Sequence, residues 1–296
     1  MSSSKIKGWV VAARPKTLPA AIAPILPGAA LAWSKDSFKL LPVIAALSAA
    51  LLLQIAVNIA NDYFDFVHGI DTPDRVGPTR AAAGGLLSLK QMRRGMVGIT
   101  LFILTIGVYL IYIAGLPILF IGLASVLSVY LYSAGPFPLS TNALGDLFVF
   151  IFFGPVAVCG TYYVQTLNLN IEIILYSVSV GLLITAIIVV NNYRDIKTDT
   201  AGRKLTLAVI LGEKFSRIEY YLLVIIAYLI PPALFFATNA SPWILLSLIS
   251  APLWITLFRD INGRVRGQAL NKTLTGTAKA GLLFSILLSL GIVLSV

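Results

Sequence analysis

The chain has 296 residues, of which 58% are hydrophobic and only 11% are charged, with a formal net charge of +10. Soluble domains carry roughly 25% charged residues, so this composition excludes a soluble enzyme and predicts an integral membrane protein. The single histidine, His68, excludes a zinc site built from several imidazoles, and the single cysteine, Cys159, excludes an internal disulfide.

Apolar segments of the length needed to cross a bilayer, about 20 residues each, follow one another along the chain. They cover residues 17–33, 40–61, 95–114, 117–133, 144–166, 171–192, 218–237, 242–258 and 277–295. Proline interrupts the first and the fifth, which a helix packed among neighbours tolerates. The sequence therefore predicts a single all-α domain over residues 1–296, an integral membrane bundle of about nine transmembrane helices.

The connections between these segments are alternately short and long, and the positive charge follows this alternation. Of the 22 lysine and arginine residues, all but Lys35 and Lys39 lie on the side of the N-terminus and the longer loops. By the positive-inside rule this side is cytoplasmic, so we expect the N-terminus inside and the C-terminus outside. Membrane topology thus explains the basic excess, which does not indicate binding to nucleic acid.

Two acidic rows stand at the ends of the second and the sixth predicted helix, both on the expected cytoplasmic side. The first acidic row consists of Asn58, Asn61, Asp62 and Asp65. The second acidic row consists of Asn191, Asn192, Asp195 and Asp199. Spacings of three and four residues place each row on one face of a helix. We expect the bundle to bring the two rows face to face.

Facing carboxylates near the hydrocarbon core require a compensating cation. One charged side chain there costs roughly 2.5–3.5 kcal/mol, and carboxylates a few ångströms apart repel each other strongly at reduced dielectric. Oxygen ligands without histidine or cysteine favour a hard ion, and Mg²⁺ takes a few carboxylates together with substrate phosphates. The simpler alternative is that these helix-terminal residues lie in headgroup water without a function.

Basic residues follow each acidic row in loops that contain glycine, proline and threonine. They are Arg75, Arg80, Lys197, Arg203 and Lys204. The positive-inside rule can explain each one alone, but carboxylates interleaved with cations suit a metal-bound polyphosphate. At the mouth of an apolar bundle this indicates a lipid diphosphate with its isoprenoid tail among the helices. Metal and cations would stabilise diphosphate as the leaving group, and an electron-rich acceptor would capture the allylic carbocation in a site that excludes water.

The acidic rows carry a resemblance to a known family. The strings NDYFD, at residues 61–65, and DIKTD, at residues 195–199, resemble the motifs NDxxDxxxD and DxxxD of the UbiA superfamily of intramembrane aromatic prenyltransferases. The third aspartate of the first motif is displaced, because position 69 is glycine and Asp71 comes two residues later. Residues 14–24, 61–85 and 191–212 look like the branch of the family that acts in menaquinone biosynthesis.

That resemblance implies a nine-helix fold and Mg²⁺-dependent transfer of a polyprenyl group from polyprenyl diphosphate to 1,4-dihydroxy-2-naphthoate, giving demethylmenaquinone, CO₂ and diphosphate. The residues it implies as ligands of metal and diphosphate are Asn61, Asp62, Asp65, Asp195 and Asp199. It places Tyr132 near the reacting centre, where an interfacial tyrosine is the alternative. Arg14 and Lys16 are candidates for pairing with the acceptor carboxylate, and Asn58 and Asn192 for orienting the carboxylates.

Other functions stay open on the sequence alone. The acceptor could instead be 4-hydroxybenzoate, homogentisate, haem or a glycerol-phosphate ether lipid. A transporter or lipid carrier would place acidic residues and broken helices near the bilayer midplane, whereas here the rows gather at one face. A lipid phosphotransferase would need a DG-xx-AR string, which the sequence lacks.

Overall fold

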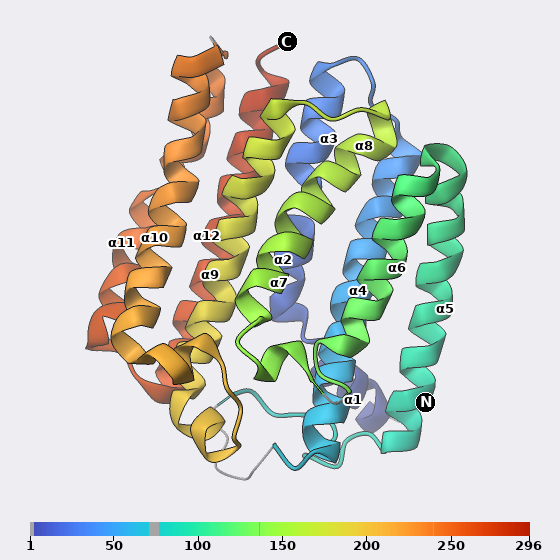
Figure 1. The fold of residues 1–296 in the computed structure, drawn as a ribbon, viewed down its shortest axis with the longest axis vertical. Coiled ribbons are helices and arrows are strands. Elements are labelled where there is room, and N and C mark those ends of the chain that lie inside the picture. The colour runs from blue at the N-terminus through green and yellow to red at the C-terminus, as the bar shows by residue number, and fades with distance from the viewer. Residues whose placement is uncertain (1–2, 71–76, 136, 239) are drawn as a thin grey trace.

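Long apolar helices that run between two ends of the molecule form the described part of the chain, as the computed structural model in Figure 1 shows. The structure describes residues 3–70, 77–135, 137–238 and 240–296. Within these ranges eight helical spans are long and apolar enough to cross a membrane, and α6 is a shorter apolar helix. The prediction of an all-α membrane bundle of about nine helices is confirmed.

The α-helices of the described ranges are α1 (Ser3–Ala13), α2 (Leu18–Ile22), α3 (Ile25–Ser34), α4 (Leu40–Val67), α5 (Leu89–Ala114), α6 (Leu116–Leu131), α7 (Gly145–Ile151), α8 (Gly160–Thr166), α9 (Ile171–Ala201), α10 (Leu207–Thr238), α11 (Pro252–Arg259) and α12 (Leu270–Val293). Shorter 3₁₀ or π segments are η1 (Pro15–Thr17), η2 (Leu139–Thr141), η3 (Phe152–Cys159), η4 (Pro242–Ser250), η5 (Asp260–Arg264) and η6 (Gly267–Ala269).

Several helices extend beyond the apolar segments predicted for them. α5 begins at Leu89 because Ser88 and Gln91 form a reciprocal capping box at its start. α4 and α9 continue to Val67 and Ala201, so both acidic rows lie inside the last turns of long helices. Proline has the expected effect in the fifth segment, where Pro155 falls within the π-helical segment η3 between α7 and α8.

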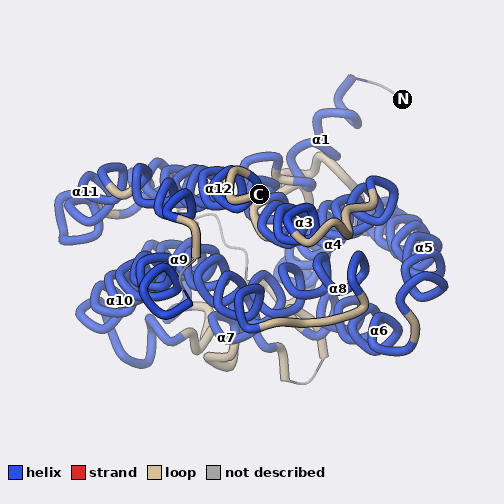
Figure 2. Tube along the Cα trace, turned by 90° about the horizontal axis from the view of Figure 1, so that it is seen from above, coloured by secondary structure: helices blue, strands red, loops and turns tan. Residues whose placement is uncertain are grey.

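Seen from above, the helices form two facing layers (Figure 2), one with α12, α3 and α4 and the other with α10, α9, α7, α8 and α6. α9 packs against α10, α12, α7 and η3, and its apolar side chains form much of the largest core. The approach of α9 to η3 is very close, since a Cβ on Gly181 would lie 2.9 Å from the Cα of Gly154. Small residues thus hold the central helix against the π-helical segment.

The outer face of the bundle is apolar. Large side chains such as Phe102 and Val108 on α5 and Phe236 on α10 are more than two-thirds exposed, at 69%, 68% and 80%. A monomeric soluble protein rarely exposes contiguous apolar surface on this scale, whereas a bilayer accepts it. The chain is therefore an integral, multi-pass membrane protein.

Both acidic rows lie at one end of the bundle. The N-terminal helix α1 lies at this end, and the C-terminus lies at the other (Figure 1). The segment after α4 meets the end of α9, because a Cβ on Gly202 would lie 3.7 Å from Cγ2 of Ile70. The assignment of this end to the cytoplasm stays a prediction from the positive-inside rule.

Candidate active site

An apolar cavity of about 540 Å³ lies inside the bundle, lined by residues from α4, α5, α6, η3 and α9 among other elements. On α4 its wall is formed by small residues, among them Ala46, Ala49 and Ala50. Polar side chains from several elements also contribute to the lining. They are Arg14, Thr17, Gln54, Asn58, Asn61, Ser125, Ser128, Tyr132, Thr161 and Asn191. Because Asn58 and Asn61 belong to the first acidic row and Asn191 to the second, the cavity reaches both rows.

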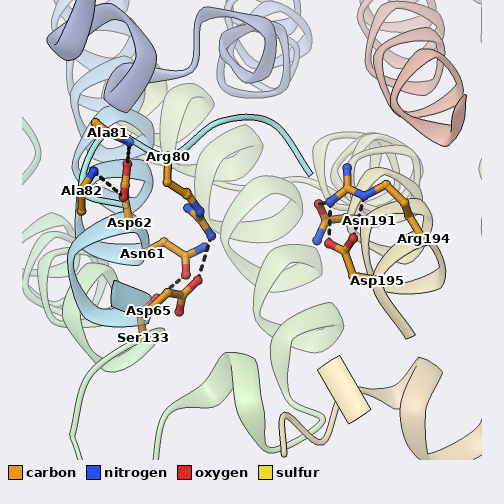
Figure 3. A network of polar contacts seen from close by, with 10 residues as sticks. All are labelled: Asn61, Asp62, Asp65, Arg80, Ala81, Ala82, Ser133, Asn191, Arg194 and Asp195. Carbon is orange, nitrogen blue, oxygen red and sulfur yellow. Dashed lines mark hydrogen bonds and ion pairs between the residues drawn. The ribbon is translucent and has the colours of Figure 1, made fainter. Parts of the chain in front are cut away.

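The carboxylates of the first acidic row are buried and held by the segment that follows α4. Asp62 accepts hydrogen bonds from the backbone N–H groups of Ala81 (2.7 Å) and Ala82 (3.2 Å). Asp65 accepts from Nη2 of Arg80 at 2.8 Å (Figure 3). Charged groups removed from water need such partners, and here the chain folds back on α4 to supply them.

The asparagines of the first acidic row connect α4 to other segments. Asn58 Nδ2 donates to the Ala13 carbonyl and to Thr17 Oγ1, both at 3.0 Å. Gln54, one turn earlier, donates to Thr17 Oγ1 at 3.3 Å and to Asn58 Oδ1 at 3.4 Å. Asn61 Oδ1 accepts from Ser133 Oγ at 3.0 Å. Among the described residues Asn58 thus orients the chain around η1 and not a carboxylate, which differs from the role expected for it.

In the second acidic row a buried arginine accompanies the carboxylates. Arg194 donates from Nε to Asp195 Oδ1 at 2.7 Å and from Nη2 to Asp195 Oδ2. The same guanidinium bonds Oδ1 of Asn191 at 2.8 Å and, on α12, Oδ1 of Asn271 at 2.6 Å. Asp199 is buried one turn further along α9. Figure 3 shows Asn191, Arg194 and Asp195 on the opposite side of the site from Asp65 and Arg80.

Tyr132, the first residue after α6, lines the cavity. Its Oη lies 3.4 Å from where a Cβ of Gly145 would stand. Burial raises the pKa of Tyr132 well above its ordinary value, and the negative charges of Asp146, Asp65 and Asp199 raise it further, while Arg14 lowers it. Because carboxylates of both rows act on the same hydroxyl, Tyr132 lies within electrostatic range of each row, and it stays protonated.

Asp146 is a buried carboxylate behind Tyr132 that the sequence analysis did not single out. It lies in the first turn of α7 and accepts a hydrogen bond of 3.5 Å from Nδ2 of Asn192. Its Oδ1 is buried without a hydrogen-bond partner among the described residues. Among the described residues Asn192 therefore contacts Asp146, and its expected role in orienting the carboxylates of the rows stays a prediction.

The two loops at this end of the bundle are bonded to each other. Ala143 N–H donates to the Leu205 carbonyl at 2.7 Å, and Leu205 N–H donates to the Thr141 carbonyl at 3.1 Å. These bonds join the segment between α6 and α7 to the segment that follows α9. The loop that positions Tyr132 is thereby fixed to the chain that leaves the second acidic row.

The remaining predicted residues lie in different surroundings. Lys16, Lys197 and Arg203 are exposed, and Lys204 is half-buried. Arg80 is buried against the first acidic row, and Arg14 lines the cavity. Arg75 and Asp71 lie outside the described residues. The structure therefore brings Arg14 and Arg80 to the site, whereas the exposed basic residues lie on the surface at this end.

The residue types of the two rows fit a hard divalent ion. Carboxylate and amide oxygens are donors that Mg²⁺ accepts, and it commonly completes its shell with water and substrate phosphates. Within the described ranges no group of three histidine, cysteine, aspartate or glutamate side chains is close enough to hold an ion by itself.

A family model for the UbiA prenyltransferase family matches residues 21–293. The chain belongs to the UbiA prenyltransferase family. Curated members of similar sequence include the 1,4-dihydroxy-2-naphthoate octaprenyltransferase of Escherichia coli (strain K12), which is 37% identical over 300 residues covering 99% of this chain and 97% of the relative. The enzyme of the same name from Bacillus subtilis (strain 168) is 32% identical, with 95% of this chain and 91% of the relative covered. The UbiA resemblance and the expectation of a prenyltransferase are confirmed.

Solved structures of UbiA proteins have the same fold. A UbiA homolog from Archaeoglobus fulgidus bound to DMAPP and Mg²⁺ has a TM-score of 0.68 at 15% identity, with 97% of this chain and 99% of that chain covered. The apo structure of a UbiA homolog from Aeropyrum pernix K1 also has a TM-score of 0.68, at 17% identity. At these identities the likeness concerns the fold.

Arg194 and Gln54 are further polar residues of the site that the sequence analysis passed over. Each lies in a long apolar helix, and a polar side chain in such a helix is a functional candidate by default. That signal was available in the sequence. Their hydrogen-bond partners could not be read from the sequence, because Asn271 and Thr17 belong to other elements and come close only when the helices pack.

Proposed function

We propose that this UbiA-family protein transfers a polyprenyl group from polyprenyl diphosphate to 1,4-dihydroxy-2-naphthoate, with release of CO₂ and diphosphate and formation of demethylmenaquinol, the reduced form of demethylmenaquinone. The observation that carries the proposal is that residues of both acidic rows line one apolar cavity, while the carboxylates of the rows are buried. The names of the relatives from E. coli and B. subtilis support the acceptor.

The diphosphate would bind at the two acidic rows together with Mg²⁺. Asn61, Asp62 and Asp65 on α4 and Asp195 and Asp199 on α9 are the residues that would hold the ion. Bound there, Mg²⁺ would neutralise the charge that develops on the diphosphate as it leaves. Support comes from the donor chemistry of the rows and from the solved UbiA homologs with Mg²⁺ and DMAPP or GPP.

Basic groups of the chain would share the charge of the diphosphate. Arg80 is buried beside Asp65, and this position would let its guanidinium bind phosphate oxygens. Lys204 is half-buried, and its N–H donates to the backbone carbonyl of Asp199 at 2.8 Å. Planar guanidinium groups match phosphate oxygens well. Lys197 is exposed within the last turns of α9 and not in the expected loop, and Arg203 is exposed in the segment after it. Both would assist from the surface, and Arg75, which lies outside the described residues, stays a candidate.

The cavity would hold the isoprenoid tail and the aromatic ring. Its wall of alanines and branched side chains suits the tail and excludes water from the carbocation. Arg14 lines the cavity with Thr17, and its guanidinium would pair with the acceptor carboxylate. Tyr132, kept protonated, would donate a hydrogen bond near the reacting centre. Lys16, which is exposed, would act at longer range. The rows would face the cytoplasm, with the C-terminus outside.

The test is an acceptor-competition assay with the purified protein in detergent or liposomes. Mg²⁺, a polyprenyl diphosphate and equal amounts of 1,4-dihydroxy-2-naphthoate, 4-hydroxybenzoate and homogentisate are supplied together, and the products are identified by mass spectrometry. We expect prenylated naphthoate product with loss of one CO₂, and no product when Mg²⁺ is chelated. A prenylated benzoate or homogentisate as the main product would overturn the acceptor assignment. Absence of any prenylated product would overturn the activity.

A further inference from the structure

Arg194 is a buried arginine in the middle of the second acidic row. Its side chain is only 1% exposed, and its guanidinium donates hydrogen bonds to three side chains. Asn191 and Asp195 are on the same helix, whereas Asn271 is on α12. Arginine has five N–H donors in a rigid fork, and this geometry fixes the fork from two helices at once.

Both carboxylate oxygens of Asp195 are occupied by Arg194, at 2.7 Å to Oδ1 and by a further short bond to Oδ2. The guanidinium uses one lone pair on each oxygen of Asp195, so a divalent ion would have to bind through the lone pairs that remain or displace the arginine. It would also approach a fixed positive charge at reduced dielectric. The arginine therefore opposes ion binding at Asp195 while it holds the carboxylate in place.

The guanidinium of Arg194 also donates hydrogen bonds to two asparagines, which can hold it when Asp195 moves away. Asn271 Oδ1 lies 2.6 Å from Nη1, and Asn191, which also lines the cavity, lies 2.8 Å from Nη2. If the carboxylate turns toward an ion, Arg194 keeps two anchors that do not involve Asp195. It can release the acid without leaving its site, and Asn191 stays oriented toward the cavity.

We propose that Arg194 is a positioning residue that competes with the divalent ion for Asp195. In the absence of the ion it neutralises Asp195 and orders Asn191. When the ion arrives, the carboxylate is exchanged from the guanidinium to the ion, and Asn271 retains the arginine. The inference rests on the proposed function, because it takes the second acidic row as part of the Mg²⁺–diphosphate site.

The experiment measures ion binding without turnover. Wild type, Arg194→Gln and Arg194→Lys are titrated in detergent with MgCl₂ in the presence of inorganic pyrophosphate, and the midpoint is read from the rise in melting temperature. Competition predicts that Arg194→Gln is less stable without the ion but needs about tenfold less Mg²⁺, a coupling typical of neighbouring charges. Arg194→Lys, which keeps the charge but loses the fork, should fall between the two. Arg94→Gln, at an exposed position on α5, is the matched control and should keep the wild-type midpoint.

A purely structural role of Arg194 predicts the opposite change in the Mg²⁺ midpoint. An arginine that only supports the site would, once replaced, raise the Mg²⁺ midpoint, and a midpoint unchanged or raised in both Arg194 variants would overturn the proposal. Arg194→Lys guards against a folding defect of the glutamine variant. Failure of the proposed function is separate, because then the wild-type protein itself shows neither prenylated product nor a response to Mg²⁺ with pyrophosphate.

Discussion

The guanidinium of Arg80 lies 2.8 Å from Oδ2 of Asp65, with both side chains only 4% exposed, although 15 positions separate them in the sequence. The pair joins the last turn of α4 to the chain that follows it. Together with the amide groups that bind Asp62, it attaches residues 80–82 to the first acidic row. The carboxylates are thereby held before any substrate arrives.

Replacement of Arg80 by glutamine should destabilise the protein strongly. Removing one partner of a buried ion pair leaves a desolvated charge, which costs about 3–5 kcal/mol. We expect a clearly lower melting temperature in detergent, and partial recovery in the double variant Arg80→Gln/Asp65→Asn, in which both charges are gone. Arg94→Gln should melt like the wild-type protein. Equal melting temperatures for Arg80→Gln and wild type would contradict the importance of the pair.

Conversion of Asp199 to asparagine should remove catalysis and leave the protein inserted. The change keeps the side-chain shape but removes a negative charge to which the proposed function assigns the binding of metal and diphosphate, and loss of one such electrostatic contact lowers kcat by roughly 100-fold or more. Product formation is measured beside expression level and gel-filtration profile. Asp36→Asn, at an exposed position in the short connection between α3 and α4, is the matched control. Wild-type turnover in Asp199→Asn would remove this residue from the proposed site.

Sequence periodicity was sufficient to predict the helices and the place of the rows. Equal spacing of Asn58, Asn61 and Asp65 and of Asn192, Asp195 and Asp199 indicated one face on each of two helices, and both rows do lie in the last turns of long helices at the same end of the bundle. The prediction succeeded because the 3.6-residue helical repeat depends only on the sequence of the helix itself and not on which helices pack against it.

Contacts between distant elements could not be predicted in the same way. Asn192 bonds Asp146, which is 46 positions away, and Arg194 bonds Asn271, which is 77 positions away. Such pairs depend on which helices pack together, and apolar segments of similar composition carry little information about their neighbours. The supporting residues Asp146, Arg194 and Asn271 were therefore missed, whereas Arg80 and the rows themselves were singled out.

The hydroxyl of Tyr132 should contribute to turnover as a donor, not as an anion. Burial and the surrounding carboxylates raise its pKa, so its neutral form persists through the range in which the enzyme is assayed, about pH 6 to 9. Tyr132→Phe should lower kcat roughly tenfold, as for one lost hydrogen bond of about 1.4 kcal/mol. The shape of the pH–rate profile should not change, because no proton leaves Tyr132 in this range. A basic limb that disappears in Tyr132→Phe would show that this tyrosine ionises during catalysis.

The alanines of α4 should limit which isoprenoid chains the enzyme accepts. Ala50 is part of the wall of the 540 Å³ cavity, so Ala50→Phe would fill space that the proposal assigns to the tail. A short donor such as geranyl diphosphate needs less of this space than a long polyprenyl diphosphate. We expect kcat/KM for the long donor to fall at least roughly tenfold more than for the short one, within the range in which hydrophobic pockets discriminate by size.

Ile44→Phe provides the control for that substitution. Ile44 is on the same helix but is 48% exposed on its outer surface, so the added ring would contact lipid and not the cavity. Both donors should then react as in the wild-type protein. If Ala50→Phe slows the two donors equally, the substitution acts on the acidic rows or on stability, and the tail must lie elsewhere. If it slows only the long donor, the cavity of the bundle interior is the path of the isoprenoid chain.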